Sequence, residues 1–492
     1  MLEGNGVVWL MLNKIMNFRI LTALALLTAA APAMPLSAGT VYSVVGNPVF
    51  SGAYSPRGAL IFSGGYLFGA STHGGANGVG SIYRFDPASG SFQINHSFAM
   101  DNGGVNPSSG ILVGSDTKLY GVNFGGVNGE GTLFRIDQPG NTFETLRPFA
   151  LASGGTPDGP PIQAADGKLY GVTGTGGANG FGGIYQVNVN GTGYSLIHEF
   201  TGTTGSRRGK GEFCRGLVEG PGGMLYGCTN LGGNATDTGM FFVASTNGTT
   251  YNFMHAFDGP GFTKPSNQLL LASDGFFYGA ASEGGNGNVG GIFRIAANGD
   301  YTELHHFSNG LDGYSVISPL IEGSDGRLYG CASYSSTGWG SVFRMSKDGT
   351  NFAVLHRFSD ESTDGLQPGG PLLETANGVF YGTTTAGGAN LAGTIFKIET
   401  TLETPVVQVT GKTRPTFRGN TLRLSGTASD DLAVARVEYL TKGGYKSAEG
   451  TTAWNARIKV KPSTKRVTVQ VRSSDGDGLF SPVSTIRARR KS

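Results

Sequence analysis

Short runs of alternating apolar and polar residues cover most of the chain after the first forty residues. Residues 132–136 (TLFRI), 291–295 (GIFRI) and 301–307 (YTELHHF) are examples. Alternation with a period of two over five to seven residues is typical of strands with one buried face. No stretch of this region has the spacing of an amphipathic helix, so the pattern predicts an all-β protein.

An aromatic residue followed by glycine recurs seven times at spacings of 50 to 56 residues. The seven pairs are Phe68-Gly69, Tyr120-Gly121, Tyr170-Gly171, Tyr226-Gly227, Tyr278-Gly279, Tyr329-Gly330 and Tyr381-Gly382. Each pair lies in the second of four strand-like runs, often after an Asp-Gly turn, which supplies the positive φ of a tight hairpin. Four short antiparallel strands in each of seven copies predict a seven-bladed β-propeller.

The ends of the repeat region predict how the propeller closes. The seventh copy supplies its third strand, residues 394–398 (TIFKI), and then has no fourth. Residues 40–45 (TVYSVV) form a strand-like run that precedes the first copy. Pairing the two would complete the last blade and remove an open sheet edge. We therefore expect the N-terminal strand to close the last blade.

The repeat resembles the GloVer-type (Gloeo/Verruco) tandem-repeat family of secreted bacterial proteins. The family pattern, approximately L-Y-G-x-T-x-x-G-G-x-x-G-x-G-T-x-F followed by L-H-x-F, matches from about Val41 to Ile398, for example in FYGTTTAGG at 380–388. Copy six departs from it at Ser335-Ser336, and copy four at residues 234–237. The resemblance implies the fold and an exported location, but no activity.

The chain changes character after Thr404-Pro405, where the repeat ends. Alternating runs at 421–425, 435–439, 456–460 and 466–472 predict an immunoglobulin-like β-sandwich, with Trp454 in its core. The segment from Ser425 to Asp431 resembles bacterial immunoglobulin-like modules of surface proteins. The expected domains are a signal peptide at 1–38, a propeller at 39–402 and a sandwich at 403–492.

Charge supports the boundary between the last two domains. The formal net charge is +2 overall, but it is −9 up to Glu403 and +11 from Thr404 onward. A basic domain attracts nucleic acid or anionic envelope polymers, although a solvated charged surface is the simpler interpretation. Glycine supplies 84 of 492 residues without a collagen-like period, which indicates many tight turns.

The first residues have the pattern of an export signal. Lys14 and Arg19 precede an apolar run from Ile20 to Ala31, which is too short to span a bilayer. Small residues at 31–33 and 36–38 offer two cleavage sites, and Met16 is a candidate start; an uncleaved membrane anchor is the alternative. We expect an exported protein, periplasmic, extracellular or at the cell surface, whose mature chain has no transmembrane segment and is monomeric.

Two of the three cysteines lie at an equivalent position of the repeat. Cys228 and Cys331 occupy the position after Leu-Tyr-Gly, where other copies have Ala, Val or Thr, so they are expected to be packing residues. A disulfide between Cys214 and Cys228 is an alternative that requires strict geometry.

Candidate chemistry is sparse. A shared repeat position predicts a role in blade packing or in a repeated hydrogen bond for His96, His198, His255, His305 and His356. His73 and His306 have no Cys, His or Asp at metal-ligand spacing, and Asp475 with Asp477 are too few for a calcium site. No metal and no cofactor are therefore expected.

Loops that join neighbouring blades should share one face of the propeller with the Gly-rich loops, and binding residues concentrate on such loops. Where the repeat is broken, this face offers candidate ligand contacts: Phe181, Arg207, Arg208, Lys210, Tyr334 and Trp339. Aromatic rings there can stack on sugars and the basic residues can hold an anion, or Phe181 and Trp339 can simply pack between loops.

Two function classes remain on this evidence. The first is a non-catalytic binding or adhesion protein for an extracellular glycan or a surface protein, with no specific nucleic-acid partner. The second is a glycosidase or lyase that uses loop carboxylates, for which the candidates are Asp101, Asp158, Asp312 and Asp364.

Overall fold

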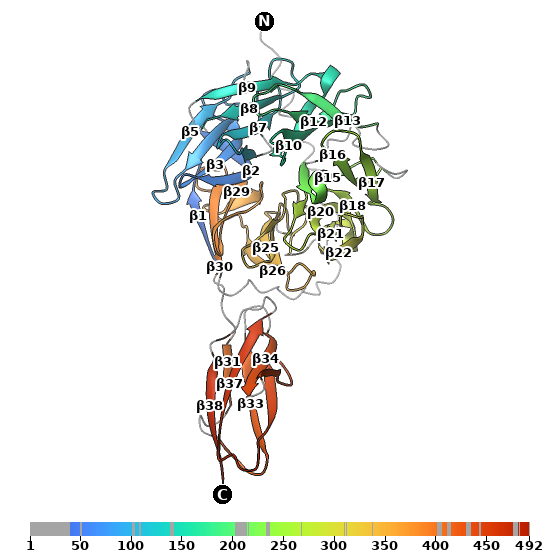
Figure 1. Cartoon of the computed structure of the whole chain (residues 1–492). Helices are drawn as coiled ribbons and strands as arrows, with labels where there is room; N and C mark the ends of the chain where they lie inside the picture. Colours follow the sequence, from blue (N-terminus) through green and yellow to red (C-terminus); the bar gives the residue numbers. More distant parts are fainter. Residues whose placement is uncertain are drawn as a thin grey trace, which may run out of the picture. The chain divides into compact units, whose positions relative to one another are not determined.

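The computed structural model describes residues 40–491, apart from residues 50–51, 101–103, 108–109, 138–141, 202–213, 215, 233–236, 267, 309, 311, 337, 401–405, 411–414, 430–433, 442–443, 476–480 and 482. Within these residues the protein is all-β, as predicted (Figure 1). The helical structure described consists of three short 3-10 turns: η1 (Leu151–Ser153), η2 (Pro221–Gly223) and η3 (Asn286–Asn288). The expected signal peptide, 1–38, lies outside the described residues.

Seven antiparallel sheets between residues 40 and 400 correspond to the seven sequence copies, and we call them repeat sheets one to seven. Sheet one is β2 (Ala53–Ser63), β3 (Tyr66–Gly74), β4 (Ser81–Phe85) and β5 (Phe92–Ser97). Sheet two is β6 (Ile111–Val113), β7 (Leu119–Asn123), β8 (Thr132–Ile136) and β9 (Phe143–Pro148). Sheet three is β10 (Gly155–Gln163), β11 (Leu169–Thr175), β12 (Gly183–Val187) and β13 (Ser195–Glu199).

The remaining repeat sheets are also antiparallel, but in sheets five and seven two short strands replace the first strand, and in sheet seven β1 takes the last position. Sheet four is β14 (Leu217–Gly220), β15 (Met224–Thr229), β16 (Met240–Ser245) and β17 (Tyr251–Ala256). Sheet five is β18 (Phe262–Pro265), β19 (Leu270–Leu271), β20 (Phe277–Gly284), β21 (Gly291–Ile295) and β22 (Tyr301–His306). Sheet six is β23 (Ile321–Glu322), β24 (Leu328–Ala332), β25 (Ser341–Met345) and β26 (Ala353–Arg357). Sheet seven is β27 (Gly365–Pro368), β28 (Leu373–Ala376), β29 (Val379–Gly387), β30 (Thr394–Thr400) and β1 (Thr40–Gly46).

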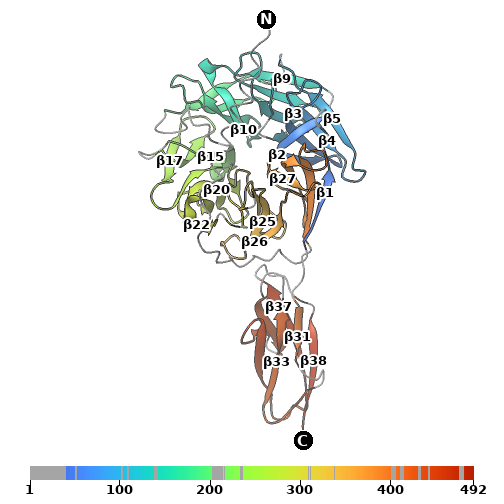
Figure 2. The ribbon, with the colours of Figure 1, turned by 180° about the vertical axis from the view of Figure 1, so that it is seen from behind.

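The predicted pairing of the N-terminal strand with the seventh copy is confirmed. Strand β1 pairs antiparallel with β30, with Tyr42 opposite Ile398 and Val44 opposite Phe396. Figures 1 and 2 both show the two strands side by side. Residues more than 340 positions apart in the sequence therefore complete one sheet.

The recurring glycine after the aromatic residue is explained by close packing within each sheet. A Cβ atom on Gly121 would lie 2.5 Å from the Phe134 ring on the next strand. The third strand of every copy places a Tyr or Phe ring over the equivalent glycine. A side chain here would displace a buried aromatic ring, so the repeat requires glycine at this position.

Neighbouring repeat sheets share hydrophobic clusters, and sheet seven contacts both its neighbours. One cluster joins Tyr83 and Phe85 of sheet one to Tyr381 and Ile395 of sheet seven. Another joins sheets six and seven through residues that include Tyr329 and Phe396. In addition, the backbone N–H of Ser55 donates to Ala392 O at 2.9 Å. The first and last repeat sheets are therefore packed against each other.

The repeated histidines form ring stacks between sheets, which confirms their predicted packing role. The pairs are His96–Phe143, His198–Tyr251, His255–Tyr301, His305–Phe352 and His356–Tyr42, with centroid separations of 3.5 to 4.6 Å. Copy two has Arg147 at this position, and its guanidinium lies 4.3 Å from the centre of the Tyr194 ring. A planar group at this position thus covers an aromatic ring of the next sheet in six copies.

The cysteines are free and buried, so the structure contains no disulfide between Cys214 and Cys228. Burial raises the pKa of the Cys214 and Cys331 thiols to about 12. Thiols with a raised pKa are poor nucleophiles, which agrees with the packing role predicted for Cys228 and Cys331.

The C-terminal sheet pair follows the repeat sheets. One sheet is β31 (Val406–Val409), β33 (Thr421–Ser429) and β36 (Ala453–Lys459). The other has the order β32 (Thr416–Phe417), β38 (Ser484–Arg490), β37 (Arg466–Asp475), β34 (Val434–Thr441) and β35 (Gly444–Ser447). The two sheets share one hydrophobic cluster, and Trp454 is buried in it as expected.

Candidate functional site

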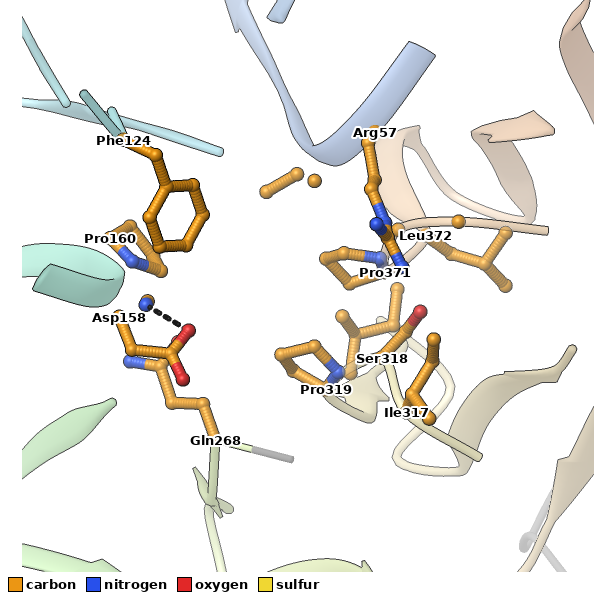
Figure 3. Close-up of a pocket in the computed structure, with 16 residues that line it drawn as sticks. Arg57, Phe124, Asp158, Pro160, Gln268, Ile317, Ser318, Pro319, Pro371 and Leu372 are labelled. Atoms are coloured by element: carbon orange, nitrogen blue, oxygen red, sulfur yellow. Dashed lines mark hydrogen bonds between the residues drawn. The ribbon is translucent and has the colours of Figure 1, made fainter. Parts of the chain in front are cut away.

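A cavity of about 470 Å³ lies among the first strands of the repeat sheets. Its lining comes from sheets one, two, three, five, six and seven (Figure 3). Residues from six sheets that are far apart in the sequence therefore surround one space.

Most lining residues come from the same place in each copy, a triplet just before the apolar residues of the first strand. The triplets are Arg57-Gly58-Ala59, Asp158-Gly159-Pro160, Ile317-Ser318-Pro319 and Gly369-Gly370-Pro371. Gln268 holds the third position in copy five, and Phe124 enters from a Gly-rich loop. The copies share the backbone at this position but differ in the side chains that they direct into the cavity.

A residue with positive φ fixes the backbone just before each of these triplets. It lies two positions ahead of the triplet, and φ is 59° at Ser55, 45° at Thr156 and 57° at Gln367. The N–H of Thr156 donates to Glu130 O at 2.7 Å, and that of Gln367 to Trp339 O at 3.0 Å. Positive φ is costly for residues other than glycine, so contacts with the preceding sheet hold this conformation.

The cavity combines one cation, one anion and several apolar surfaces. Figure 3 shows Arg57, Phe124 and Asp158 directed toward the cavity from different sheets, with Pro160, Pro319 and Pro371 between them. Arg57 is exposed and Asp158 is half-buried. Asp158 accepts a hydrogen bond from the Gly159 N–H at 3.1 Å, which orients its carboxylate.

This arrangement can bind a polar ligand of small size. A guanidinium binds carboxylates or phosphates through two parallel hydrogen bonds, and a carboxylate accepts hydrogen bonds from hydroxyl groups or cations. Phe124 and the prolines offer apolar surfaces for the faces of a ring. Gln268 is fixed in place because its Nε2 donates to Leu217 O at 2.6 Å.

The predicted ligand contacts that the structure describes, Phe181, Tyr334 and Trp339, lie outside this cavity. Phe181 is half-buried and packs against the cluster between sheets three and four. Tyr334, 38% exposed, stacks on Tyr314 with ring centres 5.8 Å apart. Trp339 is half-buried against the cluster between sheets six and seven. None of these three lines the central cavity, so their role as ligand contacts stays a prediction. The predicted basic contacts Arg207, Arg208 and Lys210 lie outside the described residues.

The loop carboxylates do not gather at one place. Asp158 lines the central cavity, whereas Asp312 and Asp364 are buried and do not. Asp312 accepts hydrogen bonds from Ser308 N–H at 3.0 Å and Ser308 Oγ at 2.7 Å. Asp101 lies outside the described residues.

Asp364 lies at a second pocket of about 650 Å³, beside β1. It accepts hydrogen bonds from the Tyr42 hydroxyl at 2.6 Å and from the Gly365 N–H at 2.7 Å. Burial alone would raise the pKa of Asp364, but hydrogen bonds from His356 and Tyr42 outweigh it and hold that pKa below its usual range. Its oxygens are occupied by the protein, so this carboxylate is structural.

Among the described residues, no group of three or more His, Cys, Asp or Glu side chains is placed to hold a metal ion. Asp477 and the side chain of Asp475 lie outside the described residues, so the expectation that they form no calcium site stays a prediction. The part of the chain that the structure describes also contains no helix with the length and hydropathy of a membrane span.

Sequence reasoning missed Arg57, Phe124 and Gln268. Two signals could have found them. The residues after the recurring Pro56, Pro157, Pro265 and Pro368 differ sharply between copies, although their surroundings repeat. The Gly-rich loop of copy two is also one residue shorter than the others and places Phe124 directly before its Gly-Gly pair.

Two solved structures are distantly similar to the chain. The tricorn protease has 12% identity and a TM-score of 0.36, with 88% of this chain and 49% of that chain covered. This chain therefore spans about half the length of the tricorn protease. The extracellular domain of a putative one-component system from B. thetaiotaomicron has 10% identity and a TM-score of 0.22, with 88% and 85% covered. No curated protein sequence matches the chain.

The sequence model of the Gloeobacter/Verrucomicrobia repeat matches the chain twice in tandem, at residues 34–213 and 213–432. These matches cover well over half of the 492 residues. The chain belongs to the Gloeobacter/Verrucomicrobia repeat family.

Proposed function

We propose that residues 39–402 form a closed seven-bladed β-propeller and residues 403–492 an immunoglobulin-like β-sandwich. The seven repeat sheets, the completion of sheet seven by β1 and the packing of sheet seven against sheet one support the propeller. The two C-terminal sheets with a shared core support the sandwich. On this proposal, the central cavity lies on the propeller axis.

The proposed function is non-catalytic binding of a polar ligand, such as a glycan with a carboxylate or another anionic group, by an exported protein. The observation that carries it is the cavity of about 470 Å³ into which single copies direct Arg57 and Asp158 (Figure 3). In a repeat protein, side chains required only for packing recur in every copy, and these do not. Export is supported by the sequence of residues 1–38 alone.

A carbohydrate-active enzyme is the alternative, and the cavity supports it less well. Glycoside hydrolysis in most enzymes requires two carboxyl groups on either side of the scissile bond. Asp158 is the one carboxylate among the described residues that line the cavity. Binding without turnover is therefore the better proposal.

A glycan array tests the proposal with four forms of the full chain: wild type, Arg57→Gln, Asp158→Asn and Tyr334→Ala. Arg57 and Asp158 line the cavity, whereas Tyr334 lies outside it and is one of the ligand contacts predicted from sequence for the loop face. We expect wild type and Tyr334→Ala to bind the same glycans and each cavity variant to lose about tenfold or more in affinity. Loss of glycan affinity in Tyr334→Ala alone would place the binding site at the loop face predicted from sequence and not in the cavity. Turnover of a bound glycan would favour the enzyme, and no binding to any anionic or neutral glycan would contradict the proposal.

A further inference from the structure

The C-terminal sheet pair carries cationic side chains in an arrangement that packing does not explain. From Thr404 onward the chain has 17 Lys and Arg residues against 6 Asp and Glu residues. An excess of this size attracts anions, but net charge alone does not define a site.

Three cations are grouped on the outer face of the sheet formed by β31, β33 and β36. Arg423 on β33 lies directly opposite Arg457 on β36. Lys459 is two residues further along β36, on the same face and diagonal to Arg423. All three side chains are exposed, and they alternate with buried residues such as Leu422 and Ile458. We call these residues the β33–β36 triad.

Directly opposed like charges are unfavourable on a sheet, because the Cβ atoms of facing residues are only about 5 Å apart. Within the described residues, none of the three side chains makes an ion pair that would relieve this repulsion. A ligand anion would relieve it. The triad is thus arranged for an interaction that the protein itself does not provide.

The surroundings of the triad indicate which kind of anion it fits. The other outward-facing positions described on these strands are polar or small: Gln408, Thr421, Ser425, Thr427, Ala453 and Asn455. None of these is a carboxylate, and the carboxylate described nearest to them is that of Glu449, which pairs with Asn455 at the free edge of β36. These described positions also hold no aromatic ring, on which single-stranded nucleic acids usually stack, and no large apolar side chain for a lipid surface.

We propose that this face binds an acidic polysaccharide through its uronate carboxylates. Paired guanidinium groups match carboxylates, which they bind through two parallel hydrogen bonds. The hydroxyl and amide side chains around them match sugar hydroxyl groups. This binding site is separate from the central cavity and does not depend on what that cavity holds.

The second C-terminal sheet provides a matched control. Arg466 on β37 lies opposite Arg489 on β38, with Arg487 two residues along β38, and all three are exposed. This control triad has the same geometry and charge. However, the same sheet carries Glu438, whose carboxylate lies 3.3 Å from Arg436 Nε and 2.9 Å from a terminal nitrogen of Arg472. The control triad therefore tests whether binding depends on the position of the β33–β36 triad or on positive charge alone.

The test measures binding of the full chain to polygalacturonate, with neutral dextran and single-stranded DNA as further probes. One variant carries Arg423→Gln, Arg457→Gln and Lys459→Gln, and the control carries Arg466→Gln, Arg487→Gln and Arg489→Gln. We expect wild type and control to bind polygalacturonate, with affinity that falls as salt rises. The β33–β36 variant should bind about tenfold more weakly or worse.

Three results would overturn the proposal. Equal loss in both triple variants would mean that net charge alone is responsible. Tighter binding of DNA than of polygalacturonate by wild type would identify nucleic acid as the partner, and no salt-dependent binding would mean that the face is simply solvated. Thermal unfolding of each variant checks folding, and neither should lose stability, because both remove repulsion between exposed side chains.

Discussion

The Tyr42 ring lies parallel to the His356 ring, with centres 3.5 Å apart and an interplanar angle of 7°. Its hydroxyl donates a hydrogen bond to Asp364 at 2.6 Å. Tyr42 comes from the N-terminal strand, yet it takes the place that Phe143, Tyr251, Tyr301 and Phe352 take in other copies. The first strand of the chain therefore makes the same contact with sheet six that a contiguous copy would make.

Replacing Tyr42 by Phe should keep the ring stack and remove the hydrogen bond to a buried carboxylate. Hydrogen bonds to charged groups contribute about 1.5 to 3 kcal/mol, so the free energy of unfolding should fall by roughly that amount. Urea denaturation measures the change. The exposed neighbour Val41 is the control, since Val41→Ala should change stability by less than about 0.5 kcal/mol. An unchanged midpoint for Tyr42→Phe would show that the hydrogen bond adds nothing to stability.

Two glycines lie in the loop between β7 and β8, and both have positive φ. Only one of them is also in close contact with a neighbouring sheet, so replacing each by Ala distinguishes the energetic cost of the backbone conformation from that of a steric clash. Gly129 has φ of 72° with open space around a built Cβ, whereas Gly131 has φ of 93° and its Cβ would lie 2.5 Å from Pro157 of sheet three. Substitution of either by Ala costs about 1 kcal/mol for the positive φ. Gly131→Ala should cost about 1–3 kcal/mol more, because it forces the two sheets apart. Equal losses in thermal or urea unfolding would contradict this contact.

In four copies, the Tyr hydroxyl donates a hydrogen bond to the carboxylate of the turn Asp four residues before it. Tyr170 donates to Asp166 at 2.7 Å, for example, whereas copy four has Gly222 in place of the Asp. Tyr170→Phe should therefore lower the free energy of unfolding by about 1 to 2 kcal/mol. The matched variant Tyr226→Phe has no such carboxylate to lose and should be close to neutral. Similar losses in both variants would assign the effect to the hydroxyl group itself and not to the pair.

Stability should fall on mild acidification because of two of the stacked histidines. Burial lowers the pKa of His198 and of His255. Above the unfolded pKa, near 6.5, both states are neutral and the full stability is present. Below it the unfolded chain takes up protons before the folded chain does, so stability is lost as pH falls through the lowered folded values.

Urea midpoints at pH 7.5 and 5.5 measure this effect. The double variant His198→Phe, His255→Phe keeps planar rings against Tyr251 and Tyr301 but cannot titrate. Its midpoint should change less than that of wild type over the same interval. An equal change in both proteins would assign the acid sensitivity to other groups.

The repeat architecture was predictable because each copy requires the same residue types at the same positions. The glycine that follows the recurring aromatic residue lies under an aromatic ring of the next strand in all seven copies. The same sequence pattern therefore appears seven times, which makes it easy to recognise. The pairing of β1 with β30 followed from counting strands, since one was missing at the end and one was spare at the beginning. Blade packing or a repeated hydrogen bond was expected for the five histidines, but their stacking on aromatic rings of the next sheet was not identified from sequence.

The candidate site was less predictable, for a physical reason. Its residues come from positions where the copies differ, and a comparison of copies emphasises what they share. Arg57 and Asp158 line the same cavity only because segments of six repeat sheets converge on one space. Conversely, Phe181 and Trp339 stood out in the sequence, but both pack half-buried between neighbouring sheets. Departure from a repeat marks a special residue without showing where its side chain points.

The central cavity depends on closure by the N-terminal strand, because sheet seven supplies four of its lining residues. Hydrogen exchange of the β30 backbone amides tests this closure most directly. We predict that amides of β30 that face β1 exchange slowly in a chain that begins at Thr40, and at least about a hundredfold faster in one that begins at Asn47. Amides that face β29 should change much less. Equal exchange of the β1-facing amides in the two chains would contradict the closure, and with it the cavity proposed as the binding site.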